Sequence, residues 1–339
     1  MAVKTKVAVL GTGALGREHA RIYAQLAAEQ EAELVAIYDT NAAVAQQIAA
    51  RHGVPVAPSL EAAIAAAEAV SIVTPTRTHY ALARQCLIQG RHVLLEKPMT
   101  DNAAEAAELI ELARTHHCVL QVGLVERFNP VFGYLEQVAT QPRFIEAHRL
   151  SPYPKRSTDI GVVLDLMIHD LDVVLAFVKS PVVSVEAVGI PVLSQSEDIA
   201  NARLHFANGC VANLTASRIS PERMRKIRVF SGPDQKCYIS LDYRAQEGFI
   251  YRIARAEEKE SSLLKKLLAS RDSTIVSEYR NLRIVREPVP LQKGEPLRLE
   301  LQHFVRCVRE KQTPRVSGVA AKLALDLALE ITRQVQARR

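Results

Sequence analysis

The sequence predicts two domains: an α/β domain with a doubly wound parallel sheet in residues 1–123, and an α+β domain with a mainly antiparallel sheet in residues 124–339. Three observations support this prediction. A chain of 339 residues, 48% of them hydrophobic, is too long for one core and apolar enough to bury two. Its first third alternates short β-branched runs with longer helical patterns, which is typical of βαβ units. Beyond Gly123 this alternation gives way to a succession of strand patterns.

The elements of the first domain follow from hydrophobic periodicity. Strands are expected to begin at Val7, Leu34, Ala69, His92 and Val119. Helices are expected near residues 14–30, 41–52, 59–67, 79–89 and 102–116. Gly53 and Gly90 stand just past two helix ends, where a left-handed residue is favoured, and Asn102 with Glu105 has capping-box spacing.

The second domain is expected to begin with a long loop, SPYPKRSTDIG, and one helix over about residues 162–177. An antiparallel meander should follow, with strands SVEAVGI, IANARLHF, CVANLTAS, KIRVFS and KCYISLD. Asn208 and Gly209 favour a type I′ hairpin turn between the second and third of these. Residues 256–270 form an amphipathic pattern that suits either packing or oligomer formation, and two helices near 297–311 and 318–338 close the chain.

Composition narrows the class of protein. The five cysteines have no disulfide or zinc spacing, and the sequence contains neither a signal-peptide pattern nor an apolar run long enough to span a membrane. We therefore expect a soluble, cytoplasmic protein. Its net charge of +6 is dispersed and accompanied by no nucleic-acid-binding motif, which favours a small anionic ligand over nucleic acid.

A glycine motif predicts the cofactor end of the first domain. Gly11, Gly13 and Gly16 form GxGxxG directly after a strand and directly before a helix, as in Rossmann domains. There the glycines allow a tight turn, a close approach of a pyrophosphate and close helix packing, and the anion meets the helix N-terminus. The expected cofactor-binding residues here are therefore Gly11, Gly13, Ala14, Leu15 and Gly16.

Asp39 predicts the choice of dinucleotide. It ends the second strand 23 residues after Gly16, where a carboxylate can accept hydrogen bonds from both ribose hydroxyls. The carboxylate would repel a 2′-phosphate and no arginine follows it, so NAD is expected rather than NADP. The alternative is that Asp39 only caps the next helix.

Lys97 and His169 are the candidate catalytic residues. Lys97 follows a parallel strand at its carboxyl end, where open α/β sheets place their ligands, and an ammonium there could ease deprotonation of a hydroxyl. In the helix DLMIHDLD, Asp165 and His169 are four residues apart and share one face, so the carboxylate could orient an imidazole that accepts a proton. A strand-end lysine and a core histidine are the structural alternatives. A metal site that includes Asp170 or Asp172 is not expected, because these residues rotate away from that face.

In this order and spacing, the glycine motif, Asp39, the HVLLEKP string and the DLMIHDLD helix resemble the Gfo/Idh/MocA oxidoreductases over nearly the whole chain, including PLRLELQHFVRCV. The resemblance implies an NAD-binding first domain, a second domain with a large open sheet that binds substrate and forms oligomers, and hydride transfer at a carbinol carbon of a sugar or polyol. It makes Lys97 and His169 the catalytic pair, supported by Asp165, and Lys97-Pro98 a cis-peptide site. It also makes cofactor neighbours of Thr74, Pro75, His79, Glu96, Lys97 and Pro98. Only Gly161 precedes VVLDLMIH, where the family often has two or three glycines, so the substrate loop is expected to differ.

Within the family, RFNP, the DLMIHDLD helix and ASRISPERMRKIR look most like the nucleotide-sugar branch. That branch oxidises C3 of UDP-N-acetylglucosamine before an aminotransferase acts, in the synthesis of lipid A or cell-surface sugars. By this resemblance Arg127, Asn129, Arg218 and Arg223 are candidate substrate ligands. The local excess of arginine and lysine from Arg218 to Arg228 suits a diphosphate, although a solvated charged loop would have the same composition.

Three functional hypotheses follow: a nucleotide-sugar dehydrogenase, a free-sugar or cyclitol dehydrogenase, and a non-catalytic NAD-binding regulator. The presence of Lys97, Asp165 and His169 disfavours the regulator. The expected partners are a sugar, a second copy of the chain in a homodimer or homotetramer, and an aminotransferase downstream. No membrane, nucleic acid or metal is expected as a partner.

Overall fold

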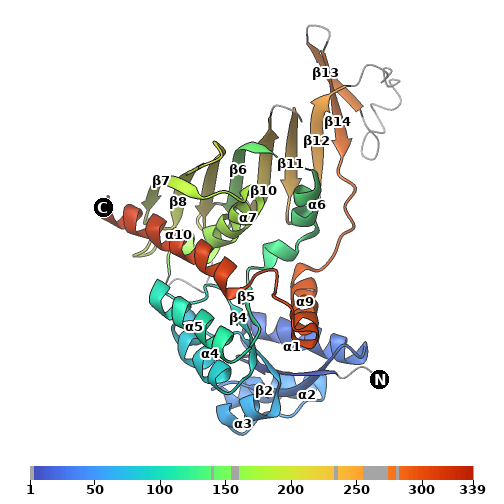
Figure 1. Cartoon of the computed structure of the whole chain (residues 1–339), viewed down its shortest axis with the longest axis vertical. Coiled ribbons are helices and arrows are strands. Elements are labelled where there is room, and N and C mark those ends of the chain that lie inside the picture. Colours follow the sequence, from blue (N-terminus) through green and yellow to red (C-terminus); the bar gives the residue numbers. More distant parts are fainter. Residues whose placement is uncertain are drawn as a thin grey trace. The chain divides into compact units, whose positions relative to one another are not determined.

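The chain divides into two compact units in the computed structural model, which describes residues 4–138, 141–153, 160–232, 236–254, 274–279 (backbone only) and 282–338. One unit comprises Met1–Phe128 and Glu295–Asp326, and the other Asn129–Gly294 and Leu327–Arg339 (Figure 1). The contacts thus group residues 295–326 with the first unit, whereas the predicted boundary at residue 123 left them in the second domain. The amphipathic pattern at 256–270 lies outside the described residues.

A parallel sheet forms the centre of the first unit. Its described strands are in the order β2-β1-β3-β4-β5, with every neighbouring pair parallel. They are β1 (Thr5–Leu10), β2 (Ala32–Tyr38), β3 (Ala69–Ile72), β4 (His92–Glu96) and β5 (Leu120–Gly123). The order reverses direction after β1, so the predicted doubly wound sheet is confirmed.

Helices separate these strands as the periodicity predicted. They are α1 (Ala14–Ala28), α2 (Ala42–His52), α3 (Leu60–Ala66), α4 (His79–Ile88) and α5 (Ala103–Thr115), with short 3₁₀ turns η1 (Thr76–Thr78) and η2 (Val125–Phe128). The helix ends also match. Gly53 and Gly90 have φ of 65° and 70°, and the side chain of Asn102 accepts a hydrogen bond from the Glu105 N–H at 2.9 Å.

Helix α9 (Pro296–Glu310) completes the core of the first unit. Its buried side chains Leu301, Phe304 and Val305 belong to one hydrophobic cluster with residues of β1, β2 and α1, including Val9 and Ile22. Burial of this apolar stripe explains why residues far along the chain belong to the first unit. Helix α10 (Gly318–Ala337) begins in the first unit and ends in the second.

The second unit contains a sheet whose nine described strands follow the order β13-β14-β12-β11-β10-β6-β9-β8-β7. The strands are β6 (Pro142–Leu150), β7 (Val182–Ile190), β8 (Ile199–Phe206), β9 (Val211–Ser217), β10 (Met224–Ser231), β11 (Cys237–Asp242), β12 (Glu247–Ile253), β13 (Thr274–Tyr279) and β14 (Leu282–Pro288). The predicted large, mainly antiparallel sheet is confirmed, but it is not a continuous meander. Strand β6 lies between β9 and β10 and pairs in parallel with β9.

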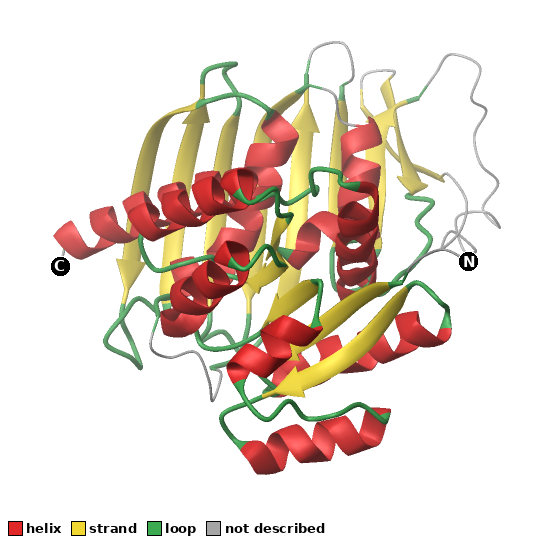
Figure 2. Cartoon of the chain, turned by 60° about the horizontal axis from the view of Figure 1, so that its bottom comes forward, coloured by secondary structure: helices red, strands yellow, loops and turns green. Residues whose placement is uncertain are grey.

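One face of this sheet carries the helices of the second unit (Figure 2). They are α6 (Pro130–Val138), the π-helical turn η3 (Val163–Met167), α7 (Ile168–Val178) and the part of α10 from Leu327 on, where Gln334 donates to Val185 O of β7 at 3.2 Å. Along β6, Ile145, Ala147 and Arg149 are buried, whereas the alternating residues Phe144, Glu146 and His148 are only partly buried. The sheet therefore has a covered face and an open face.

The hairpin between β8 and β9 has a different turn from the one predicted. Gly209 has φ of 81°, but Asn208 is not among the described residues with positive φ. The Gly209 N–H donates to Phe206 O, and the Phe206 N–H donates to Cys210 O, both at 2.9 Å. This is a three-residue loop with a left-handed glycine at its last position, whereas a type I′ turn requires positive φ at both central residues.

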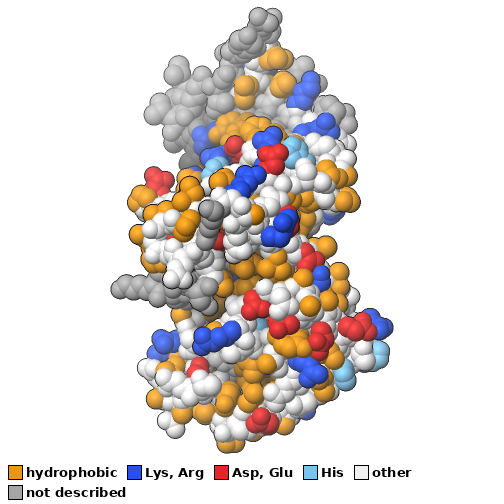
Figure 3. Space-filling model, turned by 90° about the vertical axis from the view of Figure 1, so that its left-hand side faces the viewer, with side chains coloured by type: hydrophobic (Ala, Val, Ile, Leu, Met, Phe, Trp, Pro, Cys, Tyr) orange, Lys and Arg blue, Asp and Glu red, His pale blue; other side chains and the backbone are white. Residues whose placement is uncertain are grey.

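Charge is mixed on the molecular surface. On the face shown in Figure 3, lysine and arginine side chains are interspersed with aspartate and glutamate among the described residues. Within the described part of the chain, no helix has the length and hydropathy required to cross a bilayer. In the same residues, no group of three or more His, Cys, Asp or Glu side chains is arranged to hold a metal ion.

Candidate active site

The glycine loop joins β1 to α1 at the carboxyl end of the parallel sheet. Gly11 has φ of 93°, and a Cβ there would lie 2.4 Å from the Val73 carbonyl oxygen. A Cβ on Gly16 would lie 2.0 Å from the Gly11 carbonyl oxygen, so only glycine allows this close packing. A Cβ on Gly13 would meet nothing within 4 Å. The first and third glycines therefore shape the loop, and the second leaves open space beside the start of α1.

Asp39 lies at the end of β2 and contacts this loop. Its Oδ2 accepts hydrogen bonds from the Thr12 N–H at 2.6 Å and the Thr12 hydroxyl at 2.8 Å, and its Oδ1 accepts from the Asn41 N–H at 2.8 Å. Burial raises the pKa of the Asp39 carboxyl, but these hydrogen bonds outweigh burial and the net pKa is lowered. The cap of α2 is Asn41, whose side chain accepts from the Val44 N–H. Capping does not explain Asp39.

These residues fit a dinucleotide. The first N–H groups of an α-helix have no intrahelical partners, and the open space at Gly13 lets a pyrophosphate approach those of Ala14 and Leu15. Asp39 supplies an ionised acceptor at the end of the neighbouring strand, where ribose hydroxyls need one. The residues that would hold the cofactor are therefore present with suitable chemistry.

The turns after β3 and β4 are braced by a buried histidine. His79 Nδ1 lies 2.8 Å from Pro98 O, and Nε2 lies 2.9 Å from Thr74 O. Burial lowers the pKa of the His79 ring, and the two carbonyl contacts oppose that shift only in part. Because both ring nitrogens face main-chain carbonyls, His79 holds the strand ends where Pro75 and Lys97 also lie. The Lys97–Pro98 peptide bond is cis, as the resemblance implied.

A second buried histidine, which the sequence did not single out, lies behind Glu96. His19 Nε2 is 3.2 Å from Glu96 Oε1, and its Nδ1 is 2.8 Å from the Ser71 hydroxyl. Glu96 Oε2 accepts from the Lys97 N–H at 3.2 Å, and Glu96 packs against Gly123, where a Cβ would lie 2.7 Å from Oε1. This series of contacts fixes the backbone that presents Lys97. His19 was not predicted, because its position on α1 does not indicate its partners on β3 and β4.

The predicted proton acceptor lies in the second unit, on a helix that does not start as a regular α-helix. Asp165 is in the π-helical turn η3, and His169 is the second residue of α7. A π turn thus takes the place of the α-helical spacing that the sequence predicts between them, and the pairing of Asp165 with His169 remains a prediction. Asp170 is held by Arg149 of β6 through two hydrogen bonds of 2.9 Å, and both side chains are buried. This bidentate pair fastens α7 to the sheet next to His169.

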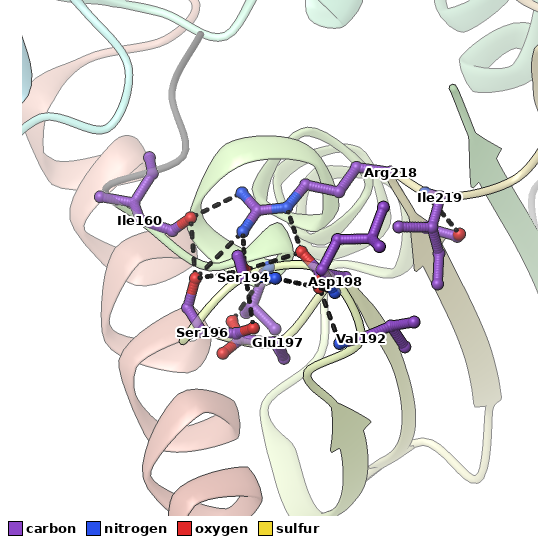
Figure 4. A network of polar contacts seen from close by, with 11 residues as sticks. Ile160, Val192, Ser194, Ser196, Glu197, Asp198, Arg218 and Ile219 are labelled. Carbon is purple, nitrogen blue, oxygen red and sulfur yellow. Dashed lines mark hydrogen bonds and ion pairs between the residues drawn. The ribbon is translucent and has the colours of Figure 1, made fainter. Parts of the chain in front are cut away.

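Arg218 was predicted to contact a diphosphate, but its side chain is buried among acceptors of the second unit. Its side chain is fully buried, and its Nε lies 2.9 Å from Asp198 Oδ1 (Figure 4). Its two terminal nitrogens donate to Ile160 O at 2.7 Å and to the hydroxyls of Ser194 and Ser196 at 2.8 and 3.0 Å. These acceptors give Arg218 a structural role. Arg223, by contrast, is exposed.

Arg127 and Asn129 are also buried. Arg127 donates to Arg315 O at 3.5 Å, and Arg315 donates in return to Arg127 O at 2.9 Å, which joins η2 to the segment before α10. Asn129 Oδ1 accepts from the Val131 N–H at 3.1 Å, and its amide donates to Tyr243 O at 3.0 Å. Both ends of the Asn129 side chain therefore have partners within the second unit, at the start of α6. Substrate contacts by these two residues remain a prediction.

Two family models match the chain. The model described as an oxidoreductase family with an NAD-binding Rossmann fold matches residues 5–124. The model described as the GFO/IDH/MocA C-terminal domain matches residues 136–235. The two matched ranges lie on either side of the change from parallel to mainly antiparallel structure.

Individual relatives match over nearly the whole length. The chain is 35% identical to the UDP-N-acetylglucosamine 3-dehydrogenase of Acidithiobacillus ferrooxidans, over 99% of this chain and 98% of that one. A solved structure of that enzyme aligns with a TM-score of 0.84 over 99% of both chains. The scyllo-inositol 2-dehydrogenase (NAD(+)) of Bacillus subtilis is 26% identical, over 97% of this chain and 93% of that one.

Proposed function

The chain belongs to the Gfo/Idh/MocA family of NAD-binding oxidoreductases, and from that premise we propose that it oxidises the C3 hydroxyl of a UDP-linked N-acetylhexosamine such as UDP-N-acetylglucosamine, with NAD as the oxidant. The observation that carries the proposal is the 35% identity, over nearly the full length, to an enzyme of that activity. The presence of Lys97, Asp165 and His169 supports catalysis over a purely regulatory role.

The proposed chemistry assigns one role to each catalytic residue. A bound dinucleotide would supply the hydride acceptor for C3, so the hydroxyl proton must pass to the protein. His169 takes that proton, since imidazole titrates near neutral pH. Lys97 donates a hydrogen bond to the same oxygen and stabilises its developing negative charge. Asp165 supports the imidazole, and the Glu96 contact with the Lys97 N–H orients the lysine backbone.

Arg223 is the residue we propose for the diphosphate of the substrate. It is exposed in the loop before β10, and an arginine can form two parallel hydrogen bonds to a phosphate. Arg218 is not part of this proposal, because its donors are directed to acceptors inside the second unit.

NAD should bind more tightly than NADP, because the ionised Asp39 carboxylate favours ribose hydroxyls and repels a 2′-phosphate. Asp39→Ala should weaken NAD binding by about 10- to 100-fold, the worth of a charge-assisted hydrogen bond, and narrow the difference between the two dinucleotides. Isothermal titration calorimetry with each dinucleotide measures both effects. Glu111→Ala, which removes an exposed carboxylate from the same unit, is the control. Tighter binding of NADP to the unaltered protein would rule out this role for Asp39.

The substrate is tested by incubating the protein with NAD and a panel of nucleotide sugars, free sugars and cyclitols. Oxidation of a secondary alcohol by NAD is unfavourable near neutral pH, so the ketone must be removed, for example by a sugar aminotransferase with an amino donor. We expect a 3-keto or 3-amino product from UDP-N-acetylglucosamine under these conditions. The relationship to scyllo-inositol 2-dehydrogenase makes inositols the main competitors in the panel.

The open face of the large sheet supports a proposal about assembly. Phe144, Phe230, Tyr238 and Tyr251 lie side by side on β6, β10, β11 and β12, with successive ring centroids 5.6, 4.7 and 5.2 Å apart. We propose that a second copy of the chain covers this face in a homodimer or homotetramer, since a row of aromatic rings is typical of interfaces. Sedimentation of the protein as a monomer at micromolar concentration would exclude such an assembly.

We propose the cytoplasm as the site of action. The five cysteines are free in the structure, which suits a reducing compartment. An aminotransferase that consumes the 3-keto product is the proposed metabolic partner. Recovery of the protein in a secreted or periplasmic fraction of its cells would contradict this location.

A further inference from the structure

The loop between β7 and β8 is held rigidly by Asp198 and Arg218. Asp198 Oδ2 accepts from three consecutive backbone N–H groups, those of Val192, Leu193 and Ser194, at 2.8, 2.6 and 2.9 Å (Figure 4). Its Oδ1 accepts from Arg218, and neither side chain is exposed. A carboxylate with this many donors fixes the conformation of the loop and, with it, the position of the preceding residue, Glu197.

Glu197 connects this loop to the start of the helix that carries His169. Its backbone oxygen accepts from the Val162 N–H at 2.9 Å, and its Oε1 accepts from the Val163 N–H at 3.4 Å. Gly161 packs directly on the carboxylate, because a Cβ there would lie 1.8 Å from Oε1. Arg218 fixes the residue before, through Ile160 O. The loop therefore contacts four consecutive residues: Ser196 donates to Ile160 O at 3.3 Å, Gly161 packs on Glu197, and Val162 and Val163 donate to Glu197.

These four residues determine how the helix begins. The Asp165 N–H donates to Gly161 O at 3.0 Å, and the π-helical turn starts at Val163. A π turn holds one residue more than an α turn, and such turns are often found at functional sites. If its first residues were released, the turn could relax to α-helical geometry. Each residue of an α-helix turns about 100° around the axis, so this relaxation would reorient Asp165 relative to His169.

We propose that Glu197 is a positioning residue for His169: its side-chain oxygen anchors the π turn and thereby holds Asp165 and His169 in the orientation that catalysis needs. The role in catalysis rests on the proposed function, in which His169 accepts the substrate proton. Glu197 is 1% exposed, and its carboxylate contacts the start of the helix at Val163. It therefore acts on His169 through the helix.

Three substitutions of Glu197 test whether its hydrogen-bond acceptor or its buried charge is needed to position His169. Glu197→Gln keeps an oxygen at the same reach and loses the charge. Glu197→Asp keeps the charge and withdraws the acceptor by one methylene from the Val163 N–H. Glu197→Ala removes both, and Glu186→Ala, which truncates an exposed glutamate on β7, is the matched control.

Two measurements are made on each variant in the full chain. The first is turnover of UDP-N-acetylglucosamine with NAD, while a sugar aminotransferase and an amino donor remove the ketone, with kcat and KM determined separately. The second, which needs no substrate, is the NMR spectrum of the protein with ¹³C-labelled histidine, in which His169→Asn identifies the His169 ring signal.

We expect Glu197→Asp and Glu197→Ala to lose about 10- to 100-fold in kcat, the usual cost of a misplaced catalytic group, with KM and NAD affinity changed less than about threefold. Their His169 ring signal should shift, while Glu197→Gln and Glu186→Ala retain the signal and the kcat of the unaltered protein. Unchanged His169 signals in both Asp and Ala variants would overturn the proposal, as would a glutamine variant as impaired as the alanine one. If the unaltered protein does not oxidise the nucleotide sugar, the proposed function fails, and the His169 signal alone then decides whether Glu197 positions the ring.

Discussion

Lys97→Ala and His169→Ala should each lower kcat by about two to four orders of magnitude, the usual contribution of a positioned acid or base. His169 is the one residue proposed to accept the proton of the substrate hydroxyl. Lys97 supplies the one ammonium proposed to stabilise the developing alkoxide. The fold should remain, since neither residue belongs to the hydrophobic core of its unit, and NAD should still bind, since the glycine loop and Asp39 are unchanged. NADH formation, followed while an aminotransferase removes the ketone, gives kcat, and calorimetry with NAD gives the affinity.

Exposed residues of the same types provide the controls for this prediction. Lys6→Ala and His116→Ala truncate exposed side chains of the first unit and should keep the kcat of the unaltered protein. Residues that act together in one chemical step cause losses of activity that do not add. The double variant Lys97→Ala/His169→Ala should therefore have a kcat only slightly below that of the more impaired single variant. Turnover within about threefold of normal in either single variant would remove that residue from the mechanism.

Gly16→Ala should lower the stability of the protein, whereas Gly13→Ala should leave it unchanged. A methyl group on residue 16 would fall 2.0 Å from the Gly11 carbonyl oxygen, and backbone cannot move aside as a flexible side chain can. For Gly16→Ala we expect a loss of about 1–3 kcal/mol or more in the free energy of unfolding, together with loss of NAD binding, even though alanine is the better helix former. Thermal unfolding and calorimetry measure the two effects.

Gly13→Ala should leave the protein as stable as before, because its φ is −59° and its Cβ meets nothing within 4 Å. NAD affinity should nevertheless fall at least about tenfold, since the methyl group occupies the space through which a pyrophosphate reaches the helix N-terminus. Normal NAD binding by this variant would show that the pyrophosphate lies elsewhere, and a stable Gly16→Ala variant would contradict the packing argument.

The fold of the first unit was predictable because its patterns are local. Strong alternation of buried strands and amphipathic helices, with Gly53 and Asn102 marking helix ends, gave element bounds within a few residues of those observed. The large sheet was predicted less completely. Strand β6 was missed because Arg143, Glu146 and Arg149 interrupt its apolar residues, and its position between β9 and β10 depends on pairing with segments far along the chain.

In the candidate site, too, local patterns were predictable and contacts between distant residues were not. The glycine motif and Asp39 were proposed as cofactor ligands from sequence because dinucleotide binding calls for particular residues at a fixed spacing, and the structure places Asp39 against the glycine loop through Thr12. His19 and Glu197 could not, since each acts through partners distant in sequence, Glu96 in one case and Val163 in the other. The prediction for Arg218 took its charge as a sign of a ligand, whereas that charge is matched by the buried Asp198. A sequence does not show which arginine of a basic segment points inward.

The central claim is tested most directly by following the hydrogen at C3. UDP-N-acetylglucosamine carrying deuterium at C3 is incubated with the protein and NAD, with an aminotransferase or a carbonyl-trapping reagent to remove the ketone. We predict that mass spectrometry will detect the deuterium in the reduced dinucleotide, along with a 3-keto or 3-amino product that lacks it. If no deuterium reaches the dinucleotide while unlabelled myo-inositol or glucose reduces NAD readily, the enzyme is a polyol dehydrogenase and the nucleotide-sugar proposal is contradicted.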